Sequence, residues 1–163
     1  MDSDERAIDP GSPRAAAEYL IRLRPIVGDA TGVRRALLHS FRELADDVRR
    51  GGPMIAERAA AIGAERIGVF RALRDQLDGL ATPSSCSAAH MTLGRWLNRL
   101  IDCCEVLRTV GTTGDVAELG RARSLLAEAQ EYARGFNDEH TALVDEIRDL
   151  VDDATRRMRL PLR

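Results

Sequence analysis

Apolar residues recur along most of this chain at spacings that alternate between four and three residues. The pattern is clearest over about residues 85–110 and about residues 115–157. A mean spacing of 3.5 residues places apolar side chains in one seam along a helix, as in bundles whose helices cross at about +20°. The first stretch has seam positions Cys86, His90, Leu93, Leu97, Leu100, Cys104 and Leu107. The second has Leu119, Ala122, Leu126, Ala129, Ala133, Phe136, His140, Leu143, Ile147, Leu150 and Ala154. The pattern predicts two long amphipathic helices, the second with a kink or short break near residues 135–137.

Two more long helices are predicted over residues 31–50 and 53–80, where apolar residues again follow a helical spacing. The sequence "GGP" at residues 51–53 separates them, because glycine accepts the left-handed conformation that ends helices and proline suits the first helical turn. The segments "ATPSS" and "GTTGD" are the next two turns. Asp115 and Glu118 form a plausible capping pair for the last helix.

A separate short helix is expected before these four. Ser12 and Pro13 have the residue types that favour an N-cap and a first helical position. Pro25 is expected to end this helix, because proline lacks the amide hydrogen and its ring obstructs the preceding turn. Gly28 and Gly32 then extend the break.

Short turns between long helices imply antiparallel neighbours. The predicted fold is therefore all-α: an antiparallel up-down-up-down four-helix bundle with an additional short N-terminal helix. We divide the chain into a polar N-terminal arm (residues 1–12), a single helical-bundle domain (residues 13–158) and a short basic tail (residues 159–163). No sequence repeat of 33 to 47 residues is present, which excludes a solenoid.

The amino-acid composition indicates which kinds of partner and which cellular location to expect. Aromatic residues make up only 4% of the chain, which favours helix packing over sheets, and the net charge of −2 provides no field that attracts nucleic acid. All 24 basic residues are arginine, a bias typical of bacteria with GC-rich genomes. No apolar run is long enough for a transmembrane helix, and the acidic N-terminus does not resemble a signal peptide. We predict a cytoplasmic protein.

The segment "PSSCSAAH" is the strongest candidate for chemistry. Cys86 and His90 are four residues apart, so a helix presents them on one face. Counting outward from the turn at residues 111–114 brings His140 to the same level, with Asp138 or Glu139 at the margin. Thiolate and imidazole ligands suit zinc, but a closed structural site requires four ligands. We therefore treat Cys86, His90 and His140 as weak metal candidates and favour packing in the seam.

The other notable side chains have simpler interpretations. A Cys86 thiolate at a helix N-terminus would be reactive, which gives a third hypothesis of an enzyme or redox sensor. Cys103 and Cys104, with His39 roughly level with them, are expected to be buried, unreactive thiols. Trp96 is expected at the edge of the core.

No pattern of a known catalytic class is present. The chain has no Glu-x-x-His pair of a di-iron bundle, no phosphate-binding glycine loop and no nucleophile elbow. We expect a non-catalytic helical-bundle protein that acts through protein–protein interaction or self-association. The alternative is a bundle that binds a small ligand or metal, such as zinc, through Cys86, His90 and His140.

Overall fold

The computed structural model describes residues 11–159, which are helical apart from short connections. The helices are α1 (Pro13–Arg49), α2 (Ile55–Asp78), α3 (Ser87–Thr113) and α4 (Leu119–Arg159), and two 3₁₀ turns, η1 (Ser84–Cys86) and η2 (Val116–Glu118), precede α3 and α4. The predicted all-α class is confirmed. Most of the predicted arm and the last four residues of the predicted tail lie outside the described residues.

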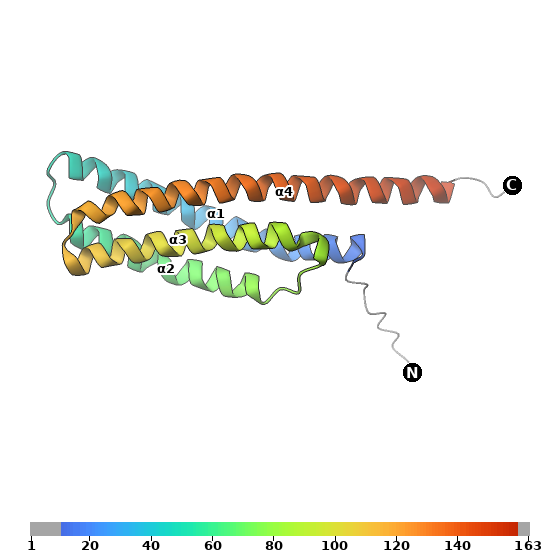
Figure 1. Ribbon diagram of the computed structural model, residues 1–163, viewed down its shortest axis with the longest axis horizontal. Helices are drawn as coiled ribbons and strands as arrows, with labels where there is room; N and C mark the ends of the chain where they lie inside the picture. Colours follow the sequence, from blue (N-terminus) through green and yellow to red (C-terminus); the bar gives the residue numbers. More distant parts are fainter. Residues whose placement is uncertain (1–10, 160–163) are drawn as a thin grey trace, which may run out of the picture.

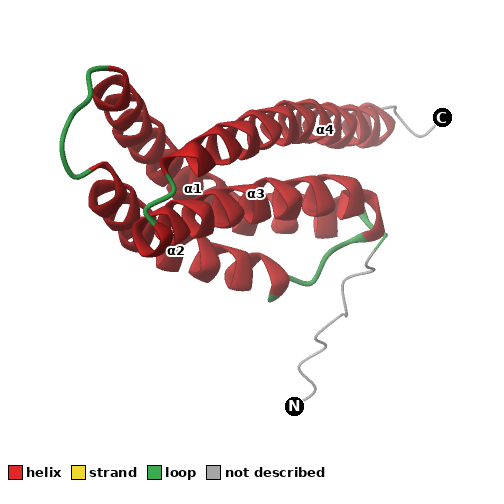
Figure 2. Cartoon of the chain, turned by 60° about the vertical axis from the view of Figure 1, so that its left-hand side comes forward, coloured by secondary structure: helices red, strands yellow, loops and turns green. Residues whose placement is uncertain are grey.

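Each helix packs against the next one in the sequence, and successive helices run in opposite directions (Figure 1). The α2/α3 and α3/α4 contacts are the most extensive, and the contact between α1 and α4 is much smaller. Figure 2 shows α3 lying between α2 and α4. Because α3 has neighbours on more than one side, its seam residues are divided among several helices.

The prediction of a separate N-terminal helix is wrong, because α1 continues through Pro25, Gly28 and Gly32. Pro25 lies on the exposed side of α1. The carbonyl on the preceding turn, which receives no hydrogen bond from proline, is therefore not left buried without a partner. The apolar seam also continues in phase on both sides of the proline, and burial of these side chains favours an unbroken helix. The buried seam residues of α1 are Ala16, Tyr19, Leu23, Ile26, Ala30, Leu37, Phe41 and Leu44.

Two of the predicted signals for helix ends are confirmed, and a third is confirmed in part. The Ser12 hydroxyl accepts a hydrogen bond from the amide of Ala15 and so caps α1. After α1, Gly51 has φ +69°, and the amide of Gly52 donates to the carbonyl of Asp47 at 2.8 Å, which closes a Schellman turn. Before η2, the Asp115 carboxylate accepts from the amide of Ala117 at 3.1 Å, as expected of a capping residue. Its own amide donates to the Thr113 hydroxyl at 3.2 Å rather than to Glu118, so the predicted pair is only half formed.

Two glycines allow α2 and α3 to approach closely. Gly111 was expected to break the third helix, but α3 continues to Thr113 and ends at Gly114, which has φ +70°. A Cβ atom at Gly111 would lie 2.2 Å from the Cβ of Ala60, and one at Gly63 would lie 2.4 Å from the carbonyl oxygen of Cys104. Gly111 is therefore a packing residue inside the helix rather than a helix end.

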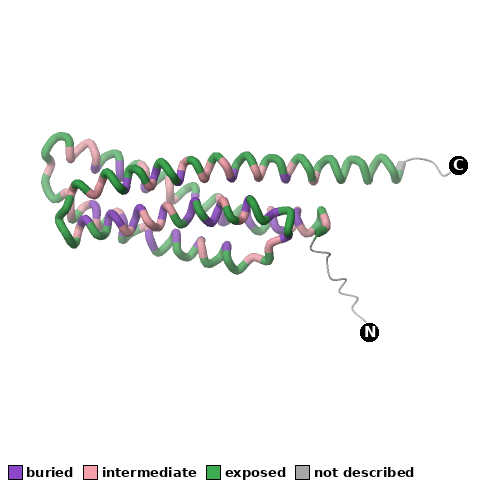
Figure 3. Tube along the Cα trace, viewed as in Figure 1, coloured by how far each residue is buried: buried purple, intermediate pink, exposed green. Residues whose placement is uncertain are grey.

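The core is formed from leucine-rich faces of all four helices together with Phe70, which is fully buried. α4 is continuous, so the kink expected near residues 135–137 is absent. Figure 3 shows that buried positions on α4 are confined to the part that lies beside the other helices. Within residues 11–159, no helix has both the length and the hydropathy required to cross a lipid bilayer.

Candidate functional site

The imidazole of His90 lies at the end of the molecule where α1 begins. Its Nδ1 atom is 2.8 Å from the Tyr19 hydroxyl and 3.0 Å from the Thr82 hydroxyl. Tyr19 belongs to α1 and Thr82 to the loop between α2 and α3, so His90 connects three segments of the chain. The Tyr19 and His90 rings also pack together, with centroids 6.1 Å apart.

Burial favours the neutral forms of both rings. Desolvation is the main cause that lowers the pKa of His90, and Arg74 acts in the same direction while Asp78 opposes it. Desolvation also raises the pKa of Tyr19 well above its ordinary value, so its phenol keeps its proton. The Tyr19 hydroxyl and the neutral His90 imidazole therefore share a hydrogen bond between uncharged groups.

Cys86 is fully buried at the start of α3. Its Sγ atom lies 3.9 Å from the Ser85 hydroxyl. Desolvation is the main cause that raises the pKa of the Cys86 thiol, and the Ser85 hydrogen bond opposes it. This environment favours the protonated thiol, whereas a reactive cysteine requires an accessible thiolate.

The structure places the third metal candidate in a different environment. His140 is half-buried beside Phe136 on α4, with ring centroids 5.7 Å apart, whereas His90 is directed to α1 and the loop before α3. Across residues 11–159, no group of three or more His, Cys, Asp and Glu side chains is placed to hold a metal ion. Zinc binding by Cys86, His90 and His140 stays a prediction from the sequence, which metal analysis of protein purified without added metal tests.

Sequence reasoning missed the two hydroxyl partners of His90. The sequence pattern places Tyr19 in a separate short helix that precedes the bundle, and Thr82 in the turn "ATPSS". A signal for Tyr19 was present in the sequence, because it occupies a seam position in phase with Leu23 and Ile26 of the same long helix.

The predictions for the remaining side chains can be compared directly with their burial. Cys103 and Cys104 are fully buried and free, and burial raises the pKa of each thiol to about 12, which fits the predicted unreactive thiols. Trp96 is buried in the core. His39 is exposed and pairs with Glu43 at 3.4 Å, so it belongs to the surface of α1.

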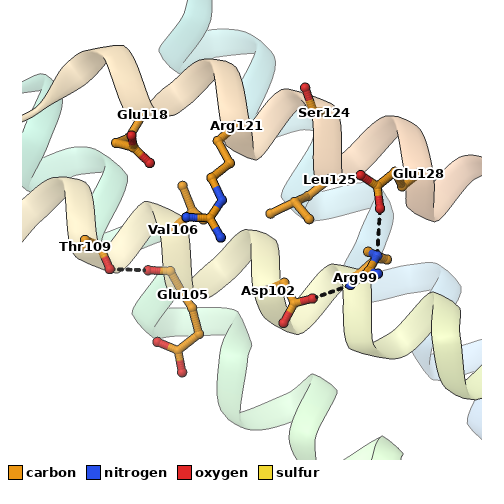
Figure 4. A pocket seen from close by; sticks show the side chains of 10 residues that line it. All are labelled: Arg99, Asp102, Glu105, Val106, Thr109, Glu118, Arg121, Ser124, Leu125 and Glu128. Atoms are coloured by element: carbon orange, nitrogen blue, oxygen red, sulfur yellow. Dashed lines mark hydrogen bonds and ion pairs between the residues drawn. The ribbon is translucent and has the colours of Figure 1, made fainter.

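A groove of about 530 Å³ lies between α3 and α4 (Figure 4). Arg99 bridges it through ion pairs of 2.7 Å to Asp102 on its own helix and to Glu128 on α4. Glu105 is engaged on the side of α2, where it pairs with Arg71. These charges neutralise one another. We therefore interpret the groove as a solvent-exposed contact between two helices rather than as a site for a charged ligand.

The most distinctive surface is the C-terminal end of α4, which extends beyond the other three helices (Figures 1 and 3). All side chains from Arg148 to Met158 are exposed. The predicted seam nevertheless continues here. Leu150, Val151 and Met158 are exposed by 45%, 55% and 84%. We call residues 147–158 of α4 the overhang, and its apolar face consists of Ile147, Leu150, Val151, Ala154 and Met158.

The overhang begins at a small apolar groove of about 50 Å³. On the side of α4 it is lined by Leu143, Glu146, Ile147 and Leu150, and on the other side by the start of α1 and Ser85. Leu143 is buried and Ile147 is half-buried, so the covered seam of α4 passes directly into the uncovered one. The exposed apolar face is therefore a continuation of the core rather than a set of scattered residues.

No protein-family model, no curated protein and no solved structure matches this chain.

Proposed function

We propose that this protein acts by binding a protein helix along the apolar face of the overhang, and that it catalyses no reaction. The observation that carries the proposal is the uncovered seam. α4 keeps the 3.5-residue apolar spacing beyond the point at which its own neighbours end. Such spacing is the pattern that a second helix covers with side chains packed into the gaps between seam residues.

Two properties distinguish this face from ordinary exposed apolar residues. Single exposed leucines and valines are common on protein surfaces and require no partner. Here the apolar residues share one side of a projecting helix, and Asp149, Asp152 and Arg156 occupy other sides. A helix that stands free of its domain also gains little stability from its own packing, so a partner helix would stabilise it.

Site-specific photo-crosslinking in the source cells tests this proposal. A photoreactive amino acid replaces Leu150 on the apolar face, and the matched control places it at Asp149, one residue away on the polar side. We expect discrete crosslinked protein products from position 150 and far fewer from position 149. Equal yields at the two positions, or no products at either, would contradict the proposal.

A further inference from the structure

We infer that the partner is a second copy of this chain, and that the two overhangs pair side by side in opposite directions. This inference rests on the proposed function, because it identifies the helix that covers the apolar face. Two properties of the end of α4 support it: the order of charges along residues 145–159, and the position of Glu146 and Arg157 on one flank of the apolar face.

The charges on the end of α4 are strongly ordered along its axis. Residues 145–153 contain five carboxylates and one arginine, whereas residues 154–159 contain three arginines and no carboxylate. A parallel pair of these helices would place acidic segments beside each other. An antiparallel pair instead brings Asp145, Glu146 and Asp149 of each copy level with the basic end of the other, while Asp152 and Asp153 of the two copies lie close to the axis. The two ends of this segment are therefore complementary in charge.

Glu146 and Arg157 fix the position of the two-fold axis. They are eleven residues apart, which is close to three full helical turns, so both lie on the same flank of the apolar face. An axis midway between them, near residues 151 and 152, places Glu146 of each copy level with Arg157 of the other. The same axis places Leu150 and Ala154 at the centre of the contact.

The antiparallel arrangement keeps the two bundles apart. Because all side chains of residues 148–158 are exposed, the bundles would lie at opposite ends of the paired helices. The end of the second helix would come level with the groove formed by Leu143, Ile147 and the start of α1. At this end of the molecule, the covered part of the α4 seam offers apolar side chains that the second helix would contact.

The length of the overhang limits the strength of the dimer. The twelve residues of the overhang span about 18 Å of helix. Five apolar side chains per copy form an interface well below the roughly 800 Å² per partner of stable complexes. We therefore expect a weak, reversible dimer with a dissociation constant that is roughly micromolar or higher.

Sedimentation velocity across a dilution series of the full chain tests self-association. The mean mass is expected to rise from the 17.9 kDa of one chain toward twice that value as concentration increases. Leu150→Glu should shift the transition to higher concentration by about tenfold or more, since it places a charge in the apolar contact. Ile21→Glu is the matched control, because Ile21 is 72% exposed on α1 and lies outside the proposed contact.

Charge reversal tests the antiparallel arrangement independently. Glu146→Arg alone places two arginines together at each of the two contacts in the dimer, and Arg157→Glu alone places two glutamates together. Each variant is expected to dimerise about tenfold more weakly than the original chain. An equimolar mixture should recover association, because a mixed dimer restores opposite charges at both contacts. One contact then joins the two substituted positions, and the other joins the unsubstituted Glu146 of one copy to the unsubstituted Arg157 of the other.

The outcomes separate the inference from the proposed function. A chain that stays monomeric at every concentration, or a dimer that Leu150→Glu leaves unchanged, would overturn the inference. Failure of the mixed variants to recover would overturn the antiparallel arrangement. Crosslinks from position 150 to a different protein, combined with a monomeric purified chain, would leave the proposed function standing and remove only the second copy as its partner. Circular dichroism of each variant confirms that the bundle is folded.

Discussion

Gly63 lies where a side-chain carbon would come within 2.4 Å of the carbonyl oxygen of Cys104 on the facing helix. Backbone atoms cannot move aside as a flexible side chain does, so α2 and α3 would have to separate. At Gly111 an added carbon would lie 2.2 Å from the Cβ atom of Ala60, which has no rotatable bond by which to move aside. The close contact between these two helices therefore depends on the absence of a single methyl group at each position.

Gly63→Ala is expected to lower the free energy of unfolding by about 1–3 kcal/mol, because overpacking outweighs the better helix propensity of alanine. Gly68→Ala on the same helix is the matched control, since a Cβ atom there meets nothing within 4 Å. It should raise stability by about 0.5–1 kcal/mol. Chemical denaturation measures both values, and a stabilising Gly63→Ala would contradict the close approach.

The burial of His90 lowers its pKa and so predicts a loss of stability in acid. The pKa of His90 in the folded chain lies below its ordinary value of 6.5. As pH falls below about 6.5, the unfolded chain takes up this proton first, so the free energy of unfolding decreases until the folded ring is protonated too. His90→Gln should weaken this pH dependence in denaturant titrations.

His90 also shows how far the contacts of a single residue could be predicted from the sequence. Periodicity correctly placed Cys86 and His90 near one end of a helical seam. It could not identify which neighbour each residue faces, because α3 contacts α2 as well as α4. His90 is directed to Tyr19 of α1, a contact across 71 residues that depends on tertiary packing and has no local signal.

At the scale of elements, Pro25 shows a local rule overridden by packing. The rule that proline ends a helix is sound for an isolated segment, and it led to the wrong prediction of a short N-terminal helix. In α1 the buried residues on both sides of Pro25 belong to one stripe, so a break would have exposed part of that stripe. The phase of the apolar residues was therefore a better guide than the proline itself.

Pro25→Ala is expected to stabilise the protein by roughly 2 kcal/mol. The substitution restores an amide hydrogen bond and removes the clash with the preceding turn, although the unfolded chain gains some freedom. Pro25 is exposed, so no core contact is lost. Gly28→Ala tests helix propensity alone at an open position and should give about 0.5–1 kcal/mol. Thermal and denaturant unfolding measure both, and a destabilising Pro25→Ala would contradict a continuous α1.

At the scale of the whole molecule, the structure divides into a packed body and an uncovered end of α4. The spacing of apolar residues could not predict this division, because the seam of the last helix runs to Ala154 without any change in spacing. Its length did carry a signal. The last predicted helix is much longer than the helix over residues 85–110, so part of it had to extend beyond its neighbour.

Removal of residues 149–163 tests this division. In dilute solution the truncated chain is expected to unfold within about 0.5 kcal/mol of the full chain, because the described side chains that it loses are all exposed. Leu143→Ala, within the packed body, should cost about 2–5 kcal/mol. Denaturant unfolding compares the two, and a truncated chain that cannot fold would contradict the division.

The distribution of sulfur atoms gives this molecule a defined order of oxidation. Three thiols are fully buried in the core, those of Cys86, Cys103 and Cys104. Three thioethers are exposed to solvent, those of Met54, Met91 and Met158. Peroxide therefore reaches methionine before cysteine and converts it to a polar sulfoxide, a change that reductases reverse. At Met158 that polar group would lie on the apolar face of the overhang. Oxidative conditions would then loosen an assembly built on this face while the core stays reduced.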